Sequence, residues 1–230
     1  MSEKIKNTAE VMASRSVQRE FRKEIWRKFI AAVKNYHLIE PGDHVAVCIS
    51  GGKDSMLLAK LMQMLQRRSD FPFEVKFLVM DPGYTPENRQ RILDNAALLD
   101  IPVEVRESTI FNWVEGVEKN PCYLCARMRR GFLYDRAQEL GCNKIALGHH
   151  YDDAIETFAL SLIYEGRLNS FLPVTYLDRT GLTLIRPMLY IHEKSITNFV
   201  QRQALPLVHN PCPADKTTKR EDVKALLYEL

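Results

Sequence analysis

Several features of membrane-bound and secreted proteins are missing from this sequence of 230 residues. No apolar run approaches the roughly 18–20 residues that span a bilayer, and the polar start lacks the apolar segment of a secretory signal. A strong charge of one sign is also missing, because the formal net charge is only +3. The first two absences argue against a membrane partner and against secretion, and the small net charge means that the electrostatic field of the whole protein is weak. We therefore expect a cytoplasmic globular protein, and a composition of 46% hydrophobic and 27% charged residues fits that class.

A disulfide framework is not indicated either. The five cysteines are an odd number, and the expected compartment is reducing. Cys48 lies inside an apolar run and Cys142 just before another, so we interpret both as buried structural residues.

The other three cysteines have a ligand-like arrangement. Cys122 and Cys125 form a C-x-x-C motif, and Cys212 lies far downstream between two prolines. Three thiolates could hold a four-iron cluster with one iron left open, or could join His209 in a tetrahedral zinc site. The C-x-x-C motif alone would also suit redox chemistry. The spacing leaves these alternatives open.

Alternation of strands and helices is the main structural pattern. Short apolar runs typical of buried parallel strands occur at residues 44–49, 74–80, 103–106, 144–148 and 182–185. Helical patterns occur at residues 53–68, 86–99, 122–140, 152–164, 193–203 and 219–228. This order predicts an α/β fold, a doubly wound parallel sheet with helices on both faces.

The first 40 residues differ from this pattern. Residues 1–15 are polar, and we expect them to be poorly ordered. An amphipathic helix is predicted from about Val17, because Phe21, Ile25, Phe29 and Val33 recur every four residues. We therefore divide the chain into an N-terminal basic amphipathic helix (residues 1–40), a main domain that carries the cysteine cluster (residues 41–215) and a short C-terminal helix (residues 216–230).

Basic residues are concentrated in two places, although the net charge is small. Such patches bind phosphate backbones, and the alternative is a solvated helix face. The first group is Arg19, Arg22, Lys23, Arg27 and Lys28, and the second is Arg127, Arg129 and Arg130.

The connection after the first predicted strand is rich in groups that bind phosphate. It reads Ser50-Gly51-Gly52-Lys53-Asp54-Ser55. The two glycines let the backbone turn tightly against a ligand, and the N–H groups at the helix start form an anion site. Its spacing is neither that of the Walker loop nor that of the dinucleotide-binding motif. The pattern resembles the pyrophosphate loop of the PP-loop ATPases, which implies that ATP is cleaved between its α- and β-phosphates. We expect Lys53 and Asp54 to act in catalysis.

Polar groups also follow two other predicted strands. Asp81 ends the second strand and could hold Mg²⁺ or the ribose, or could cap a turn. The segment Gly148-His149-His150-Tyr151-Asp152-Asp153 follows a later strand. Carboxyl ends of parallel strands meet at one edge of the sheet, so we expect Gly148 and His149 at the nucleotide. The alternative for His149 and for His150 is a buried histidine whose polar atoms have partners in the fold. Asp152 and Asp153 would hold Mg²⁺ beside the triphosphate, or cap the next helix, or do both.

Taken in order, these motifs resemble the tRNA 2-thiocytidine synthetase family. The likeness spans about residues 25–212. It includes the loop at 50–55, Cys122-x-x-Cys125 with the following Ala-Arg-Met-Arg-Arg-Gly, residues 146–153 and Ile185-Arg186-Pro187.

The resemblance implies a specific chemistry. Cys122, Cys125 and Cys212 would hold a four-iron four-sulfur cluster, residues 41–215 would be a PP-loop ATPase domain, and the backbone at Met80 would contact adenine. ATP would activate C2 of cytidine 32 in tRNA, and sulfur would replace the oxygen there. A cysteine desulfurase or free sulfide would serve as the sulfur donor, and a homodimer is one option for the oligomeric state.

Other functions stay open at this point. Lysidine synthetase shares the ATP chemistry but uses free lysine and needs no cysteine trio. A zinc-stabilised tRNA-binding module would leave the phosphate loop unexplained. A related PP-loop enzyme could thiolate another nucleotide, or a small molecule without any tRNA.

Overall fold

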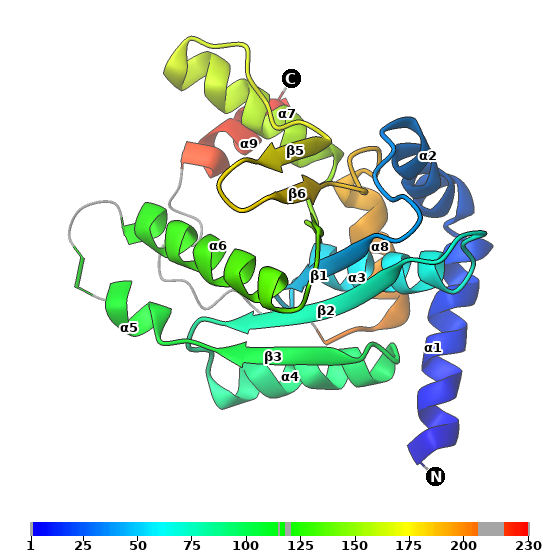
Figure 1. Cartoon of the computed structure of the whole chain (residues 1–230). Coiled ribbons are helices and arrows are strands. Elements are labelled where there is room, and N and C mark those ends of the chain that lie inside the picture. Colours follow the sequence, from blue (N-terminus) through cyan, green and yellow to red (C-terminus); the bar gives the residue numbers. More distant parts are fainter. Residues whose placement is uncertain (1, 115, 118–120, 207–218, 230) are drawn as a thin grey trace.

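A six-stranded sheet forms the centre of the protein (Figure 1). The computed structural model describes residues 2–114, 116–117, 121–206 and 219–229. The strand order is β3-β2-β1-β4-β6-β5, and every neighbouring pair is parallel except β5 and β6. The strands are β1 (His44–Ile49), β2 (Glu74–Asp81), β3 (Val103–Glu107), β4 (Lys144–Ala146), β5 (Val174–Leu177) and β6 (Leu182–Ile185). The predicted doubly wound sheet is confirmed, and the antiparallel edge strand β5 was not predicted.

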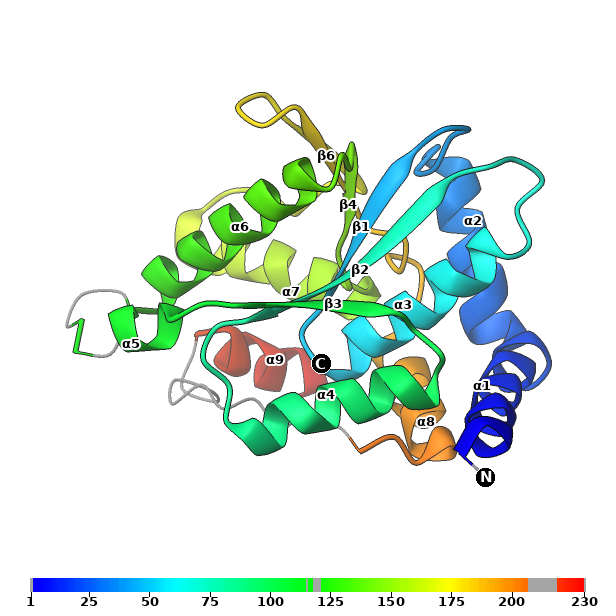
Figure 2. The same cartoon turned by 60° about the horizontal axis from the view of Figure 1, so that its bottom comes forward.

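Helices cover both faces of this sheet. Figure 2 shows α6 on one side and α3, α4 and α8 on the other. The helices of the central part are α3 (Lys53–Gln66), α4 (Pro86–Leu98), α5 (Ile110–Val114), α6 (Pro121–Glu139), α7 (Tyr151–Leu160), α8 (Glu193–Gln203) and α9 (Lys219–Glu229). These bounds agree closely with the predicted ranges, apart from α5, which was not predicted. No helix in the described ranges is both long and apolar enough to cross a membrane.

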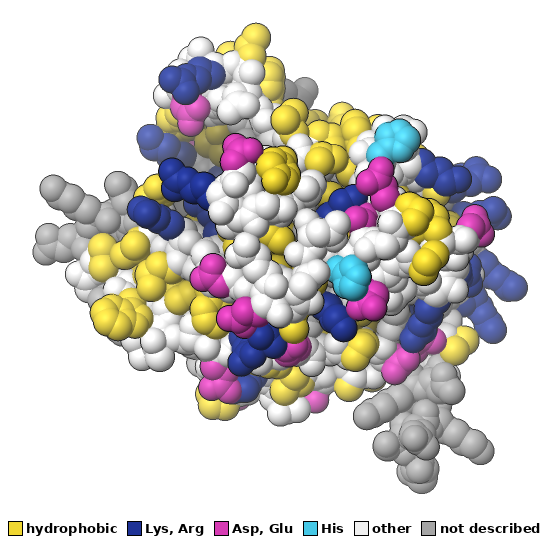
Figure 3. Space-filling model, viewed as in Figure 1, with side chains coloured by type: hydrophobic (Ala, Val, Ile, Leu, Met, Phe, Trp, Pro, Cys, Tyr) yellow, Lys and Arg dark blue, Asp and Glu magenta, His cyan; other side chains and the backbone are white. Residues whose placement is uncertain are grey.

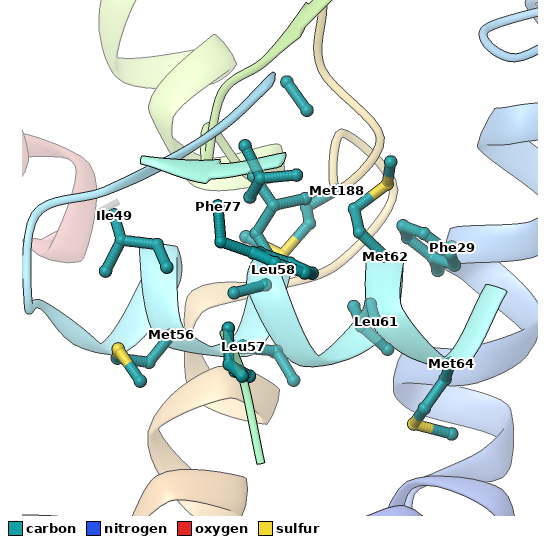
Figure 4. Packing of buried hydrophobic residues seen from close by; sticks show 14 of the residues in the cluster. Phe29, Ile49, Met56, Leu57, Leu58, Leu61, Met62, Met64, Phe77 and Met188 are labelled. Atoms are coloured by element: carbon teal, nitrogen blue, oxygen red, sulfur yellow. The ribbon is translucent and has the colours of Figure 1, made fainter. Parts of the chain in front are cut away.

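Alternation along β1 divides the core in two. Val45, Val47 and Ile49 belong to the large cluster on the α3 side, whereas Ala46 and Cys48 belong to the smaller cluster on the α6 side. Successive residues of a strand point to opposite faces, so a strand covered on both sides is apolar throughout. Figure 4 shows the large cluster, in which α3 side chains such as Leu58 and Met62 pack near Phe77 of β2 and Phe29. The start of α3 is thus held on a rigid base.

The N-terminal region differs from its prediction. Residues 1–15 were expected to be poorly ordered, but α1 (Ser2–Gln18) is a helix, followed by a π-helical segment (Arg22–Trp26) and α2 (Arg27–Asn35). For the second half of α1 the expectation was wrong, because that half carries its own packing groups. Ala13 is buried in the large cluster, and the Glu10 carboxylate accepts hydrogen bonds from Lys60 Nζ (2.7 Å) and Arg67 Nη1 (2.9 Å). One polar helix face therefore docks on α3 through ion pairs.

Basic side chains gather at two places on the surface (Figure 3). One lies on the right of that view, over α1 and α2, and the other lies on the left, between α6 and α7. The second place includes Arg129 and Arg130, which line the same pocket as Ile49 at the carboxyl end of β1. The strand order reverses at β1, because β2 lies on one side of it and β4 on the other. Ligands of open α/β sheets bind at such a switch point.

Candidate active site

The loop after β1 is folded around the side chain of Ser55. The Ser55 hydroxyl accepts hydrogen bonds from the Ser50 backbone N–H (3.1 Å) and the Ser50 hydroxyl (3.2 Å), and it donates to the Gly52 carbonyl (3.0 Å). Gly51 has a φ of +84°, a conformation that favours glycine, and Gly52 is the extended N-cap of α3. The backbone N–H groups at the start of α3 are therefore presented at the positive end of a helix, as phosphate binding requires.

Gly148 lies directly against this turn. A Cβ atom at position 148 would stand 3.3 Å from the Asp54 carbonyl carbon and 3.3 Å from the Ser55 nitrogen. Strands β1 and β4 are neighbours, so the segment after β4 supports the loop after β1. Glycine at this position allows the two backbones to approach.

A pocket of about 580 Å³ opens beside the loop. Six predicted binding residues line it, namely Ser50, Asp54, Ser55, Met80, Gly148 and His149. The predicted catalytic residue Asp153 also lines it, and α6 forms another wall with Ala126, Arg129, Arg130 and Leu133. The pocket thus joins the loop to one of the two basic clusters found in the sequence.

His150 lies between two of the predicted carboxylates, Asp54 and Asp153. It is 4% exposed, and its Nε2 lies 3.7 Å from Asp54 Oδ1 and 3.5 Å from Asp153 Oδ2. Asp153 also caps α7, since its carboxylate accepts the His150 N–H (2.9 Å). Burial raises the pKa of Asp54, and nearby Lys53 and His150 offset part of that rise. Asp54 Oδ1 is buried and has no hydrogen-bond partner among the described residues, which suits a group that meets a ligand.

Asp152 has a different position. Its carboxylate accepts the backbone N–H of Glu193 (2.7 Å) at the start of α8 and lies 3.9 Å from His192 Nδ1. It is not among the residues that line the pocket. Of the two roles predicted for Asp152, the structure shows capping, although of α8 and not of its own helix.

Lys53 points away from the pocket toward α8. Its Nζ lies 3.1 Å from Asp54 Oδ2 and 3.0 Å from Glu193 Oε1. Burial alone would lower the pKa of Lys53, but the two carboxylates raise it above its ordinary value. The lysine is therefore charged, and Glu193 is a partner that the loop motif gave no reason to expect.

Asp81 serves the turn after β2. It is 4% exposed, and its Oδ1 accepts the backbone N–H groups of Gly83 (2.9 Å) and Tyr84 (2.6 Å). Of the roles predicted for Asp81, the structure shows the capping of a turn. Its neighbour Met80 lines the pocket, whereas Asp81 does not.

His149 is held neutral inside the pocket wall. Burial lowers its pKa to about 4, and the charge of Asp153 offsets only part of the effect. The ring centroids of His149 and Phe171 lie 4.9 Å apart. The Arg186 guanidinium also packs on Phe171, with its Cζ 5.0 Å from the ring centroid. The Nδ1 atom of His149 is buried without a hydrogen-bond partner in the described part of the chain.

The three predicted metal ligands are only partly covered by the structure. Positions 122 and 125 lie one turn apart at the start of α6, and Cys125 is partly buried. Cys212 lies outside the described residues, as does His209. Among the described side chains, no three His, Cys, Asp or Glu residues form a group that could hold a metal. The cluster and zinc alternatives both stay predictions.

The two remaining cysteines fit the structural interpretation. Cys142 is buried in the α6-side cluster, against which Cys48 packs. Burial raises the pKa of both thiols, which disfavours a thiolate.

Sequence reasoning missed the contribution of α9. Arg220 lines the pocket and donates a hydrogen bond from Nη2 to Thr157 Oγ1 (2.7 Å). Nothing in the sequence distinguishes this arginine from others in polar helices. Its proximity to the loop arises only because α9 packs on α7.

Comparison with known proteins agrees with this geometry. The sequence model described as PP-loop domain matches residues 21–230. The chain belongs to the PP-loop family. Within this family it is similar to proteins named tRNA-cytidine(32) 2-sulfurtransferase. The protein from Alkalilimnicola ehrlichii is 40% identical over 86% of this chain and 64% of its own length. That from Pelobacter propionicus is 37% identical over 86% of this chain and 76% of its own length.

These relatives are longer than this chain. The PP-loop chain spans 64% of the A. ehrlichii protein and 66% of the Bordetella pertussis protein, which is 37% identical. About a third of the length of each of these two relatives has no counterpart in the matched part of this chain.

Solved structures support the fold. The U34-tRNA thiolase NcsA from Methanococcus maripaludis, solved with its 4Fe-4S cluster, has a TM-score of 0.72 at 20% identity over 89% of this chain and 71% of its own. NAD⁺ synthetase from Burkholderia pseudomallei has a TM-score of 0.51 at 13% identity, covering 97% of this chain and 91% of its own. At these identities the likeness establishes the PP-loop fold alone.

Proposed function

We propose that this protein is an ATP-dependent tRNA sulfurtransferase, which adenylates C2 of a cytidine, position 32 by its relatives' name, and replaces the oxygen with sulfur. One observation carries the proposal. A single pocket is lined by the phosphate loop, by Gly148 and His149, and by α6, whose first turns hold the C-x-x-C motif. Adenylation and sulfur delivery would then occur at one place.

The pocket suits ATP and Mg²⁺. The loop N–H groups and the start of α3 would hold pyrophosphate, and the close approach at Gly148 keeps that turn in place. Mg²⁺ prefers one or two carboxylates together with phosphate oxygens. Asp54 and Asp153, which both line the pocket, are the proposed carboxylates.

The proposed reaction has two displacements. The C2 oxygen of the cytidine attacks the α-phosphate, and pyrophosphate leaves from the loop. The sulfur nucleophile then attacks C2, and the oxygen leaves as part of AMP. Arg129 and Arg130 would stabilise the charge that develops on the phosphates, since preorganised charges lower such barriers.

Sulfur delivery is assigned to the cysteine trio. Cys122, Cys125 and Cys212 would hold a four-iron four-sulfur cluster, which supplies an open iron for exogenous sulfur when bound. Cys125 is partly buried in α6, the helix that also carries the pocket residues Arg129 and Arg130. The sulfur source would be free sulfide or a cysteine desulfurase. Cytoplasmic location and a homodimer stay predictions.

The direct test is thiolation of tRNA under anaerobic conditions. The purified protein would be incubated with ATP, Mg²⁺, sulfide and unmodified tRNA, and the digested nucleosides would be analysed by mass spectrometry. We expect 2-thiocytidine and one pyrophosphate released for each modified nucleotide. Pyrophosphate release without tRNA, or thiolation of a different nucleotide, would contradict the assignment.

The basic clusters are the proposed tRNA contacts. Replacement of the exposed Arg22, Arg27 and Arg127 by serine should weaken tRNA binding and flatten its salt dependence, because fewer counterions are released. All three side chains lie outside the pocket, so ATP binding should be retained. Equal tRNA binding by parent and variant would identify these arginines as ordinary surface charges.

A further inference from the structure

A chain of alternating charges connects the phosphate loop to the C-terminal helix. Lys53 of the loop lies 3.0 Å from Glu193 Oε1 in α8. The other carboxylate oxygen of Glu193 accepts a hydrogen bond from Lys224 of α9 (3.0 Å). Although burial alone would raise it, these two lysines lower the pKa of Glu193 to about 2. One carboxylate is thus shared between a lysine of the site and a lysine of α9.

The same helix reaches the opposite side of the site. Lys224 Nζ also lies 3.9 Å from Glu156 Oε1, and Glu156 Oε2 lies 3.6 Å from Arg220 Nε. Arg220 Nη1 lies 3.6 Å from Asp153 Oδ1. This series of ion pairs therefore begins at Lys53 and ends at Asp153, which are both predicted catalytic residues.

The side chains around Glu193 are largely shielded from solvent, whereas the Arg220 side chain is 40% exposed. Glu156 is 8% exposed, Glu193 is 19% exposed and Lys224 is 29% exposed at the side chain. Ion pairs of this kind are screened much less than surface pairs, and removal of one partner leaves a buried charge uncompensated. Loss of a charge in α9 should therefore change the ion pairing of Lys53 in the loop.

We propose that Lys224 and Arg220 of α9 are positioning residues of the ATP site, the first through Glu193 on Lys53 and the second on Asp153. This inference rests on the proposed function, because Lys53 and Asp153 can act on ATP only if the loop binds its phosphates. Lys224 carries part of the compensation of Glu193, so Lys53 can exchange Glu193 for a phosphate oxygen. Arg220 holds one oxygen of Asp153 while the other accepts the His150 N–H.

The first experiment removes Lys224. With K224M, the Glu193 carboxylate keeps Lys53 as its remaining lysine partner, and ATP must compete harder for that lysine. We expect the dissociation constant of MgATP, measured by calorimetry, to rise about tenfold, the lower range for loss of a hydrogen bond to a charged group. K219M is the matched control, because Lys219 lies on the same helix and contacts the ring of Tyr164. It should bind MgATP like the parent.

The rescue variant separates positioning from mere docking of α9. In the double variant K224M/E193Q, the carboxylate that retains Lys53 is neutral, so MgATP binding should return to the parent value. If α9 served only to hold the structure together, the second substitution would remove another contact and binding would stay weak or worsen. That result, or equal binding by K224M and parent, would overturn the role of Lys224.

The second experiment tests Arg220 with a neutral and a charged substitution. R220M should lower the rate of tRNA-dependent pyrophosphate release about tenfold, because Asp153 is no longer held in position. The Mg²⁺ concentration needed for half of the maximal rate should fall, because Asp153 loses a competing cation, as Glu193 does in K224M. R220K should restore most of the rate. An unchanged Mg²⁺ requirement in R220M would overturn this part. A parent that binds no MgATP would refute the proposed function itself, whereas a parent that binds well while the variants match it refutes only the role of α9.

Discussion

The contact between Gly148 and the phosphate loop gives the sharpest test of the site. In Gly148→Ala, the added Cβ would stand 3.3 Å from the Asp54 carbonyl carbon and the Ser55 nitrogen, and 3.4 Å from the Asp54 carbonyl oxygen. All three are backbone atoms at the start of α3, which is fixed by its buried residues. They cannot rotate away as a flexible side chain would. The loop must therefore shift by a few tenths of an ångström.

The expected loss of stability in Gly148→Ala follows from overpacking. Extra methyl groups in well-packed regions cost about 1–3 kcal/mol, and each kcal/mol lowers the melting temperature by roughly 2–4 °C in a chain of this size. The moved groups are the proposed phosphate donors, so MgATP binding should weaken together with stability. Differential scanning calorimetry and binding titration measure the two effects.

A second glycine provides the control. Gly131 lies inside α6, where an added Cβ would meet no atom within 4 Å, and its φ is not positive. Gly131→Ala should stabilise the protein by up to about 1 kcal/mol through helix propensity and leave MgATP binding unchanged. If Gly148→Ala melts and binds MgATP as the parent does, the inferred support of the loop by the segment after β4 is incorrect.

Three further predictions concern single residues. Lys53→Ala or Asp54→Ala should give a folded protein whose pyrophosphate release falls by orders of magnitude, and normal release would remove the loop from the mechanism. Cys212→Ser should lose iron and tRNA thiolation but keep MgATP binding, whereas His209→Ala should keep its metal. Zinc without acid-labile sulfide, lost in His209→Ala, would establish a zinc site instead. His149 has a pKa of about 4 in the folded protein against 6.5 ordinarily. The unfolded chain binds the extra proton between these values, so stability should fall as pH is lowered from about 6.5 to about 4. His149→Asn should reduce that slope in urea unfolding series, and an identical slope would show that other groups cause it.

Local patterns predicted most of the central fold. The apolar run at 44–49 and the helix at 193–203 have the predicted bounds, and the other strands and helices of the alternating part differ by a few residues. The reason is that buried parallel strands are apolar throughout, while helices carry a periodic apolar face and recognisable ends. Strand β5 was missed because it is short, partly exposed and paired antiparallel with β6 at the edge of the sheet.

Long-range ion pairs explain what was missed at the ends of the chain. Residues 1–15 were expected to be poorly ordered because they are polar, but Glu10 pairs with the buried Lys60, which lies 50 positions further along the chain. Arg220 and Lys224 likewise looked like ordinary surface residues of a short helix. Periodicity reports apolar burial, and it carries no information about which distant charge a polar residue will meet.

The sequence by itself determined the phosphate loop, because tight turns, N–H donors and a helix start are properties of consecutive residues at 50–55. It also determined the alternating strands and helices that bring this loop and residues 148–153 to one edge of the sheet. Only the tertiary structure decided which of the candidate residues share the pocket. It placed Asp54, Asp153 and His149 there, turned Asp81 and Asp152 to capping, and set Lys53 against Glu193. The direction of a polar side chain depends on partners contributed by other elements, and those partners are known only once the helices are packed.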